Sequence, residues 1–151
     1  MADRRRVAVT GVGVVTAAGL GADALWDSLA DGTSSLARIS GFAVDDFPCR
    51  IGAELEDFSA RKFVPRNYRK AVKVMARDIE IAVVAADMAV RDAGIVTRGI
   101  DPDNTDIDSK RIGCNIGAGL ICAQLDELGM AAHTAVVDGQ FDLKTWGREG
   151  M

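Results

Sequence analysis

RRVAVTGVGVVTAAG, residues 5–19, is the stretch from which the architecture of this chain is best inferred. Its apolar run from Val7 to Val15 is continuous rather than alternating, as is typical of a strand in a parallel sheet covered on both faces. Gly11 and Gly13 allow backbone conformations and close approaches that a Cβ atom would forbid. The stretch therefore predicts a buried strand that breaks into a glycine turn.

The next segments predict a short helix and an irregular excursion. Residues 19–30 place three apolar side chains on one side of a helix, and Asp31-Gly32 ends it. Residues 33–61 have no clear period, so we expect an irregular segment with one short strand at residues 50–53.

The rest of the chain alternates again between helix and strand. Apolar residues recur every three or four positions over residues 65–93, which predicts a long helix that Gly94 ends. An acidic loop leads to a second strand at residues 111–116, a helix at 120–130 and a short surface segment at 141–147. This order predicts an α/β domain with a mainly parallel sheet and flanking helices.

The composition is that of one globular domain and argues against several classes of function. The 151 residues are 48% hydrophobic and 26% charged, which is enough apolar material for a core. The formal net charge of −4 gives no general attraction to nucleic acid or to an anionic membrane. No apolar run approaches the roughly 20 residues of a membrane-spanning helix. We expect neither a nucleic-acid partner nor a membrane span.

The cysteines favour a protein of a reducing compartment, and the cysteines and histidine together predict no metal site. Cys49, Cys114 and Cys122 leave one cysteine unpaired under any disulfide scheme, and we interpret them as buried, inert thiols. The one histidine, His133, is a poor supply for a zinc site and is interpreted as solvent-facing. Three arginines before the apolar opening imitate a secretion signal, but the glycines and threonines there suit a strand and turn better. We expect a cytoplasmic protein.

The opening glycines also invite comparison with a dinucleotide-binding fingerprint. Its last position requires a glycine for close helix–strand packing, whereas this chain has Thr16 there. Asp31 has about the right offset for the ribose-binding acid, but it lies in the turn that ends a helix. We therefore interpret the glycines as a structural turn and expect no cofactor.

Three ordered motifs carry a family resemblance. The opening reads V-T-G-x-G-x-V-T-x-x-G and continues with W-x-x-L and G-x-S. The long helix contains Met75-Ala76-Arg77-Asp78 and closes on A-V-R-D-A-G at residues 89–94, and residues 111–119 read R-I-G-C-N-I-G-A-G. Together the motifs resemble the elongating β-ketoacyl-acyl-carrier-protein synthases, although Ala76 stands where that family often has aspartate.

The resemblance implies both a fold and a reaction. It implies that residues 1–151 are a partial amino-terminal domain, the first half of a thiolase-like fold, without the nucleophile-bearing remainder. Such enzymes hold an acyl chain on a cysteine and condense it with malonyl-carrier in fatty-acid or polyketide synthesis, with histidines promoting decarboxylation. The family's cysteine motif, histidine pair and lysine have no match here, so we name no catalytic residue and expect no activity from this chain alone.

Ile116 is the substrate-binding residue that the resemblance implies. Within the third motif it falls where the family places a bulky residue of the acyl pocket, so it would limit the entry of the acyl chain. Gly117 and Gly119 would shape the turn beside it. The alternative is an ordinary core isoleucine.

A basic run from residue 61 to 73 is interleaved with apolar residues and indicates a partner surface rather than a nucleic-acid site. Acyl carrier proteins are strongly acidic, and members of the resembled family bind them on basic residues around the pocket mouth. The resemblance thus implies carrier docking by Arg66, Arg69, Lys70 and Lys73. The alternative is a solvated helix start.

The partners and two other interpretations follow from the same residues. The preferred interpretation implies an acyl carrier protein and either a homodimer or a complementary synthase chain. A second interpretation is a non-catalytic interaction module or one piece of a split synthase, whose partner carries the cysteine, histidines and lysine. A third is a small nucleotide-binding oxidoreductase.

Overall fold

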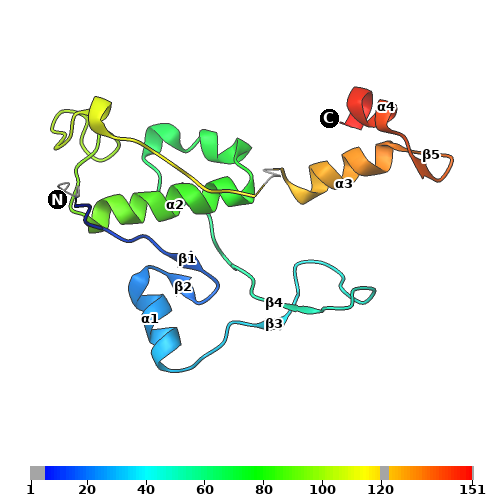
Figure 1. Cartoon of the computed structure of the whole chain (residues 1–151), viewed down its shortest axis with the longest axis horizontal. Coiled ribbons are helices and arrows are strands. Elements are labelled where there is room, and N and C mark those ends of the chain that lie inside the picture. The colour runs from blue at the N-terminus through cyan, green and yellow to red at the C-terminus, as the bar shows by residue number, and fades with distance from the viewer. Residues whose placement is uncertain (1–5, 120–122, 151) are drawn as a thin grey trace, which may run out of the picture.

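Helix α2, Arg77–Asp92, is the element against which the opening of the chain and the basic run are packed (Figure 1). A computed structural model describes residues 6–119 and 123–150. The helix ends as predicted, because Gly94 takes a φ of +68° and its N–H donates to the carbonyl of Arg91 at 2.9 Å.

The predicted helix over residues 65–93 is correct only for its second part. The basic run instead forms three short 3-10 turns, η1 (Ala60–Lys62), η2 (Arg66–Tyr68) and η3 (Ala71–Val74). Met75 and Ala76 are extended, with ψ of 131° and 159°, and this break separates η3 from α2. Valines at 72 and 74 are β-branched, which weakens helix propensity in this stretch.

From Gly11 onward the opening stretch lies against α2, whereas Val7 and Val9 are 90% and 84% exposed, so the predicted burial is wrong at its start. Only its end is a strand: β1 (Val15–Thr16) pairs with β2 (Gly19–Leu20) in an antiparallel hairpin. The predicted strand over residues 7–15 is therefore wrong for residues 7–14, which make no strand ladder among the described residues. The predicted close approach is correct, because the glycines of this stretch lie against the backbone of α2.

Three two-stranded hairpins make up the sheet structure of the described residues. Besides β1–β2, β3 (Ala37–Arg38) pairs with β4 (Ile51–Gly52), and β5 (Val136–Val137) pairs with β6 (Gln140–Phe141). All three pairs are antiparallel, so the expected mainly parallel sheet is not found in residues 6–119 and 123–150. The predicted strand at 50–53 corresponds to β4.

The second predicted strand, residues 111–116, is also not formed. The turn η4 (Ser109–Arg111) occupies its start, and residues 112–119 then run as an exposed, extended segment without regular structure. A strand needs a neighbour to accept and donate its ladder hydrogen bonds, and neither predicted strand of the parallel sheet supplies them to the other here.

Helix α1 (Ala22–Ala30) matches the predicted helix near the amino terminus. Helix α3 (Leu125–Thr134) covers part of the predicted helix at residues 120–130, of which 120–122 lie outside the described residues. Helix α3 packs on the π-helical turn η5 (Trp146–Gly150), which follows α4 (Leu143–Thr145). These elements lie at the end of the molecule opposite the N-terminus (Figure 1).

The core lies between α2 and the three 3-10 turns. Ala60, Val64 and Val72 come from the turns or the residues joining them, and Val84 comes from α2. Phe58, Phe63 and Met75 are among the partly buried residues around this cluster. The basic run is therefore anchored by its apolar residues, and its charged residues face outward. No helix in the described part of the chain is long and apolar enough to cross a bilayer.

Candidate functional site

Five basic side chains line one cavity of about 550 Å³ on the three 3-10 turns. They are Arg61, Arg66, Arg69, Lys70 and Lys73, and we call this site the basic hollow. Four of them are the residues that the resemblance implies for carrier docking, and the structure brings all four together. The fifth is Arg61, which begins the predicted basic run but was not among the four docking residues.

Four of the basic residues, at positions 66, 69, 70 and 73, are spaced so that an α-helix would group them as well, and the 3-10 turns keep them close together. A 3-10 helix has three residues per turn, so side chains three positions apart lie above one another. Arg66 and Arg69 have this spacing, and so do Lys70 and Lys73. Val64 and Val72 are buried on the opposite side and hold the turns on the core.

The basic hollow is strongly positive. All five side chains belong to exposed residues, and the described residues that line the cavity include no acid. Within residues 6–119 and 123–150 the salt bridges are Arg38–Asp45, Arg77–Glu80 and Arg91–Asp87, so none of the five cations is paired. Converging unpaired cations attract an anionic partner over about 10 Å at 0.1 M salt.

Ile116 lies apart from this chemistry. It belongs to the exposed, extended residues 112–119, is 52% exposed and is not among the residues that line the basic hollow. A Cβ atom added at neighbouring Gly117 would meet nothing within 4 Å. The acyl-pocket role of Ile116 stays a prediction.

The cysteines and the histidine lie on the surface wherever the structure describes them. Cys49 and Cys114 are free and exposed, so their interpretation as buried thiols is wrong, because the segments that carry them lie on the surface. Cys122 lies outside the described residues. His133 is exposed in the last turn of α3, as expected for a solvent-facing residue. The described residues hold no cluster of metal-ligating side chains.

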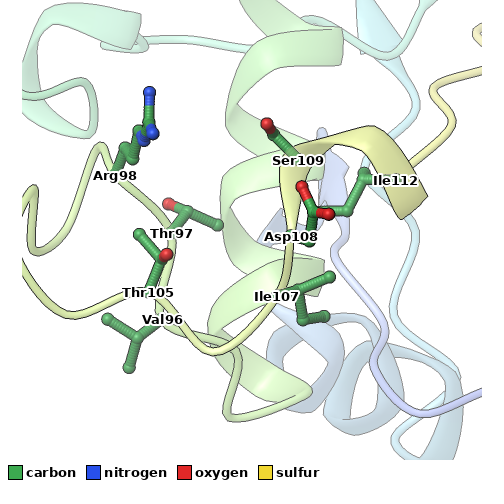
Figure 2. Close-up of a pocket in the computed structure, with 8 residues that line it drawn as sticks. All are labelled: Val96, Thr97, Arg98, Thr105, Ile107, Asp108, Ser109 and Ile112. Carbon is green, nitrogen blue, oxygen red and sulfur yellow. The ribbon is translucent and has the colours of Figure 1, made fainter.

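A second cavity, of about 320 Å³, lies within the loop that follows α2 (Figure 2). Its lining comes from residues 96–98 and 105–112 and mixes hydroxyls, aliphatic side chains, Arg98 and Asp108 (Figure 2). The loop is closed by Asp106, whose carboxylate accepts the N–H of Val96 at 2.7 Å. Charges of both signs line this cavity, so it has no marked preference for one class of ligand.

The carboxyl groups with lowered pKa values are structural. Hydrogen bonds from the N–H groups of Ser40 and Gly41, and from the Ser40 hydroxyl, lower the pKa of Glu54. The Asn104 side chain and nearby N–H groups likewise lower the pKa of Asp101. A carboxylate stabilised in this way is a weak base, so these groups hold turns and are poor candidates for proton transfer.

Comparison with known proteins agrees with the family that the motifs resemble. The family model for the N-terminal domain of β-ketoacyl synthases matches residues 4–142. The chain is 34% identical over 118 residues to 3-oxoacyl-[acyl-carrier-protein] synthase 2 of Synechocystis, which covers 78% of this chain and 26% of that protein. It is 37% identical over 93 residues to the granaticin polyketide putative β-ketoacyl synthase 2 of Streptomyces violaceoruber, covering 62% and 22%.

A solved structure shows the same relationship. The ishigamide ketosynthase/chain length factor matches 64% of this chain with a TM-score of 0.51 and 33% identity, over 23% of its own chain. This chain thus spans only about a quarter of the length of these relatives.

Proposed function

The chain belongs to the β-ketoacyl synthase family through its N-terminal domain, and we propose that it is the amino-terminal part of a β-ketoacyl-acyl-carrier-protein synthase. The complete enzyme transfers an acyl group to a cysteine, decarboxylates malonyl-carrier and forms a carbon–carbon bond. Relatives named for fatty-acid-type and for polyketide synthases both support this reaction class. We place the enzyme in the cytoplasm.

We propose that this chain alone does not catalyse the condensation. No residue of the sequence matches the family's nucleophilic cysteine, histidine pair or lysine. The whole sequence contains a single histidine. The chain would instead contribute part of a thiolase-like fold. In this proposal residues 7–14 and 112–116 become strands of a mainly parallel sheet once neighbouring strands are supplied.

The basic hollow is the carrier-docking surface in this proposal. The observation that carries it is the convergence of five unpaired cations on one cavity whose described lining has no acid. A strongly acidic carrier protein is complementary to such a surface, and complementary charge accelerates encounter and fixes orientation.

We also propose that the assembled enzyme is a dimer, either of two copies or of this chain's protein with a complementary synthase chain. The second arrangement covers the alternative function, in which the chain is a non-catalytic module or one piece of a split synthase. The similarity to a ketosynthase/chain length factor supports this alternative, since its name joins two kinds of subunit.

Charge reversal tests the docking surface. Arg69→Glu combined with Lys70→Glu should weaken binding of an acidic acyl carrier protein by at least about 10-fold at low salt, because two attractive contacts become repulsive. The matched control is Lys62→Glu, which lies in η1 beside the basic hollow but does not line it. Titration calorimetry at two salt concentrations measures both. Equal losses in the two variants, or no loss in either, would contradict the proposal.

A further inference from the structure

Arg77, the first residue of α2, joins two parts of the chain through a single side chain. Its Nη1 donates to the carbonyl of Phe58 at 2.9 Å, and its Nη2 donates to the carbonyl of Leu55 at 2.8 Å. Its guanidinium carbon also lies 4.7 Å from the centroid of the Phe58 ring. Residues 55–58 are thereby held on the start of α2.

These contacts need an arginine. The planar guanidinium donates in two directions and stacks on an aromatic face, whereas a lysine ammonium is a compact point charge. Glu80 lies one turn further along α2, and its carboxylate is 3.4 Å from Nη1 of Arg77. The side chain of Glu80 is only 16% exposed, so the pair is sheltered from solvent on that side.

Arg61 and Lys73, the first and last residues of the basic hollow along the chain, lie close in sequence to the two segments that Arg77 joins, residues 55–58 and the start of α2. Residues 55–58 lead directly into Ser59, whose hydroxyl accepts the N–H of Arg61 and starts η1. On the other side, Lys73 belongs to η3, which precedes α2 by two residues. Phe58 also stacks on Phe63, with 6.4 Å between ring centroids. The contacts of Phe58 therefore link Arg77 to the residue that follows η1.

We propose that Arg77 is a positioning residue for the basic hollow. It does not line the cavity; it fixes Arg61 relative to Lys73, so that the cations meet a carrier protein together rather than one at a time. The proposal rests on the carrier-docking function proposed above.

Arg77→Lys is the test variant, because it keeps the positive charge and removes the two-way donation. A positioning role predicts that carrier-protein affinity falls on the order of 5-fold, as it should in Arg77→Gln. A purely electrostatic role predicts that Arg77→Lys binds like the unchanged chain. Glu80→Gln, which keeps Arg77 but removes its ionic partner, should give a smaller loss in the same direction.

A double-mutant cycle separates positioning from stability. Lys70→Gln should cost less affinity in the Arg77→Lys background than in the unchanged chain, because the cations no longer act together. If Arg77 only stabilises the fold, Arg77→Lys should lower the melting temperature. At temperatures well below that melting temperature, the effects of Arg77→Lys and Lys70→Gln on affinity should then be additive. Additive effects, or an Arg77→Lys variant that binds as tightly as the unchanged chain, would overturn the inference.

Amide hydrogen exchange tests the positioning role of Arg77 independently of carrier binding. Arg77→Lys should speed exchange of the Arg61 and Lys62 amides, and unchanged exchange there would overturn the inference. An unchanged chain that does not bind carrier protein overturns the docking proposal instead. Failure of the docking proposal therefore shows in the carrier binding of the unchanged chain. Failure of the positioning inference shows in the amide exchange of the Arg77→Lys variant.

Discussion

Residues 11–14 and residues 112–119 have similar sequences but different surroundings. Both are apolar, glycine-containing stretches that lie in or continue a predicted strand, and residues 11–14 and 112–116 form no strand ladder among the described residues. The first lies against α2, where Gly11 and Gly13 approach its backbone and the N–H of Val12 donates to Asp92 at 2.8 Å. The second is exposed throughout, and a Cβ added at Gly113, Gly117 or Gly119 would touch nothing within 4 Å.

The difference shows that similar glycine patterns can have different steric requirements. In the first stretch, glycine is required because a helix backbone occupies the space of a side chain. In the second, the structure of this chain places no such demand.

The largest expected effect comes from filling the space at Gly13. A Cβ there would lie 2.6 Å from the backbone nitrogen of Ala89 and closer still to the carbonyl of Ala85. Gly13→Ala should therefore lower the free energy of unfolding by about 3 kcal/mol, since a helix backbone cannot move aside cheaply. Gly117→Ala is the matched control and should change stability by less than about 1 kcal/mol. Chemical denaturation measures both, and equal effects would remove the contrast.

A substitution at Ile116 tests whether residues 112–119 gain a function in the assembled enzyme. In a synthase that contains this domain, Ile116→Phe should reduce turnover of the longest accepted primers by about 10-fold relative to short ones, because an added ring fills a packed pocket. Competition between short and long acyl-carrier primers, read by product mass, gives this ratio. Unchanged chain-length selectivity would contradict the pocket role.

A smaller effect is expected from the hydrogen bond that holds the first stretch. Asp92→Ala removes the acceptor of the Val12 N–H and should destabilise the chain by about 1 kcal/mol. Amide exchange at Val12 should become faster, while residues 112–119 should not respond. Asp87→Ala is the control, because Asp87 pairs with Arg91 on the surface of the same helix. Faster exchange in both stretches would mean that they are coupled.

The smallest effect concerns a third extended region, the β3–β4 excursion, which is also held by a carboxylate. The pKa of Glu54 lies below its ordinary value of 4.5, because the N–H groups of Ser40 and Gly41 and the Ser40 hydroxyl donate to it. Its contribution to stability is therefore complete above the ordinary pKa and is lost as pH falls through the lowered one.

Amide NMR shifts of Ser40 and Gly41 should accordingly change at acid pH in the unchanged chain. They should be flat with pH in Glu54→Gln, which cannot titrate at this position. A pH response that persists in Glu54→Gln would assign the effect to another carboxylate.

Local signals in the sequence were sufficient for α1, for α2 and for the family. The apolar period of α2 and the positive-φ Gly94 that ends it are both present within about twenty residues, and so is the close approach at Gly11 and Gly13. Four basic residues could also be grouped from their spacing. Arg61 was part of the predicted basic run but not of the docking set, and its place in the same cavity follows from the 3-10 turn η1 in which it lies.

The sequence by itself determined α1, the second part of the long helix with its end before Gly94, and the family to which the chain belongs, because each of these depends on residues close together along the chain. Only the tertiary structure decided whether residues 7–14 and 112–116 form strands and which cations share one cavity. The hydrogen bonds of a strand belong to another segment, and the side chains of a cavity are gathered by packing on a common core. A local sequence pattern contains neither the neighbouring strand nor the other side chains of the cavity.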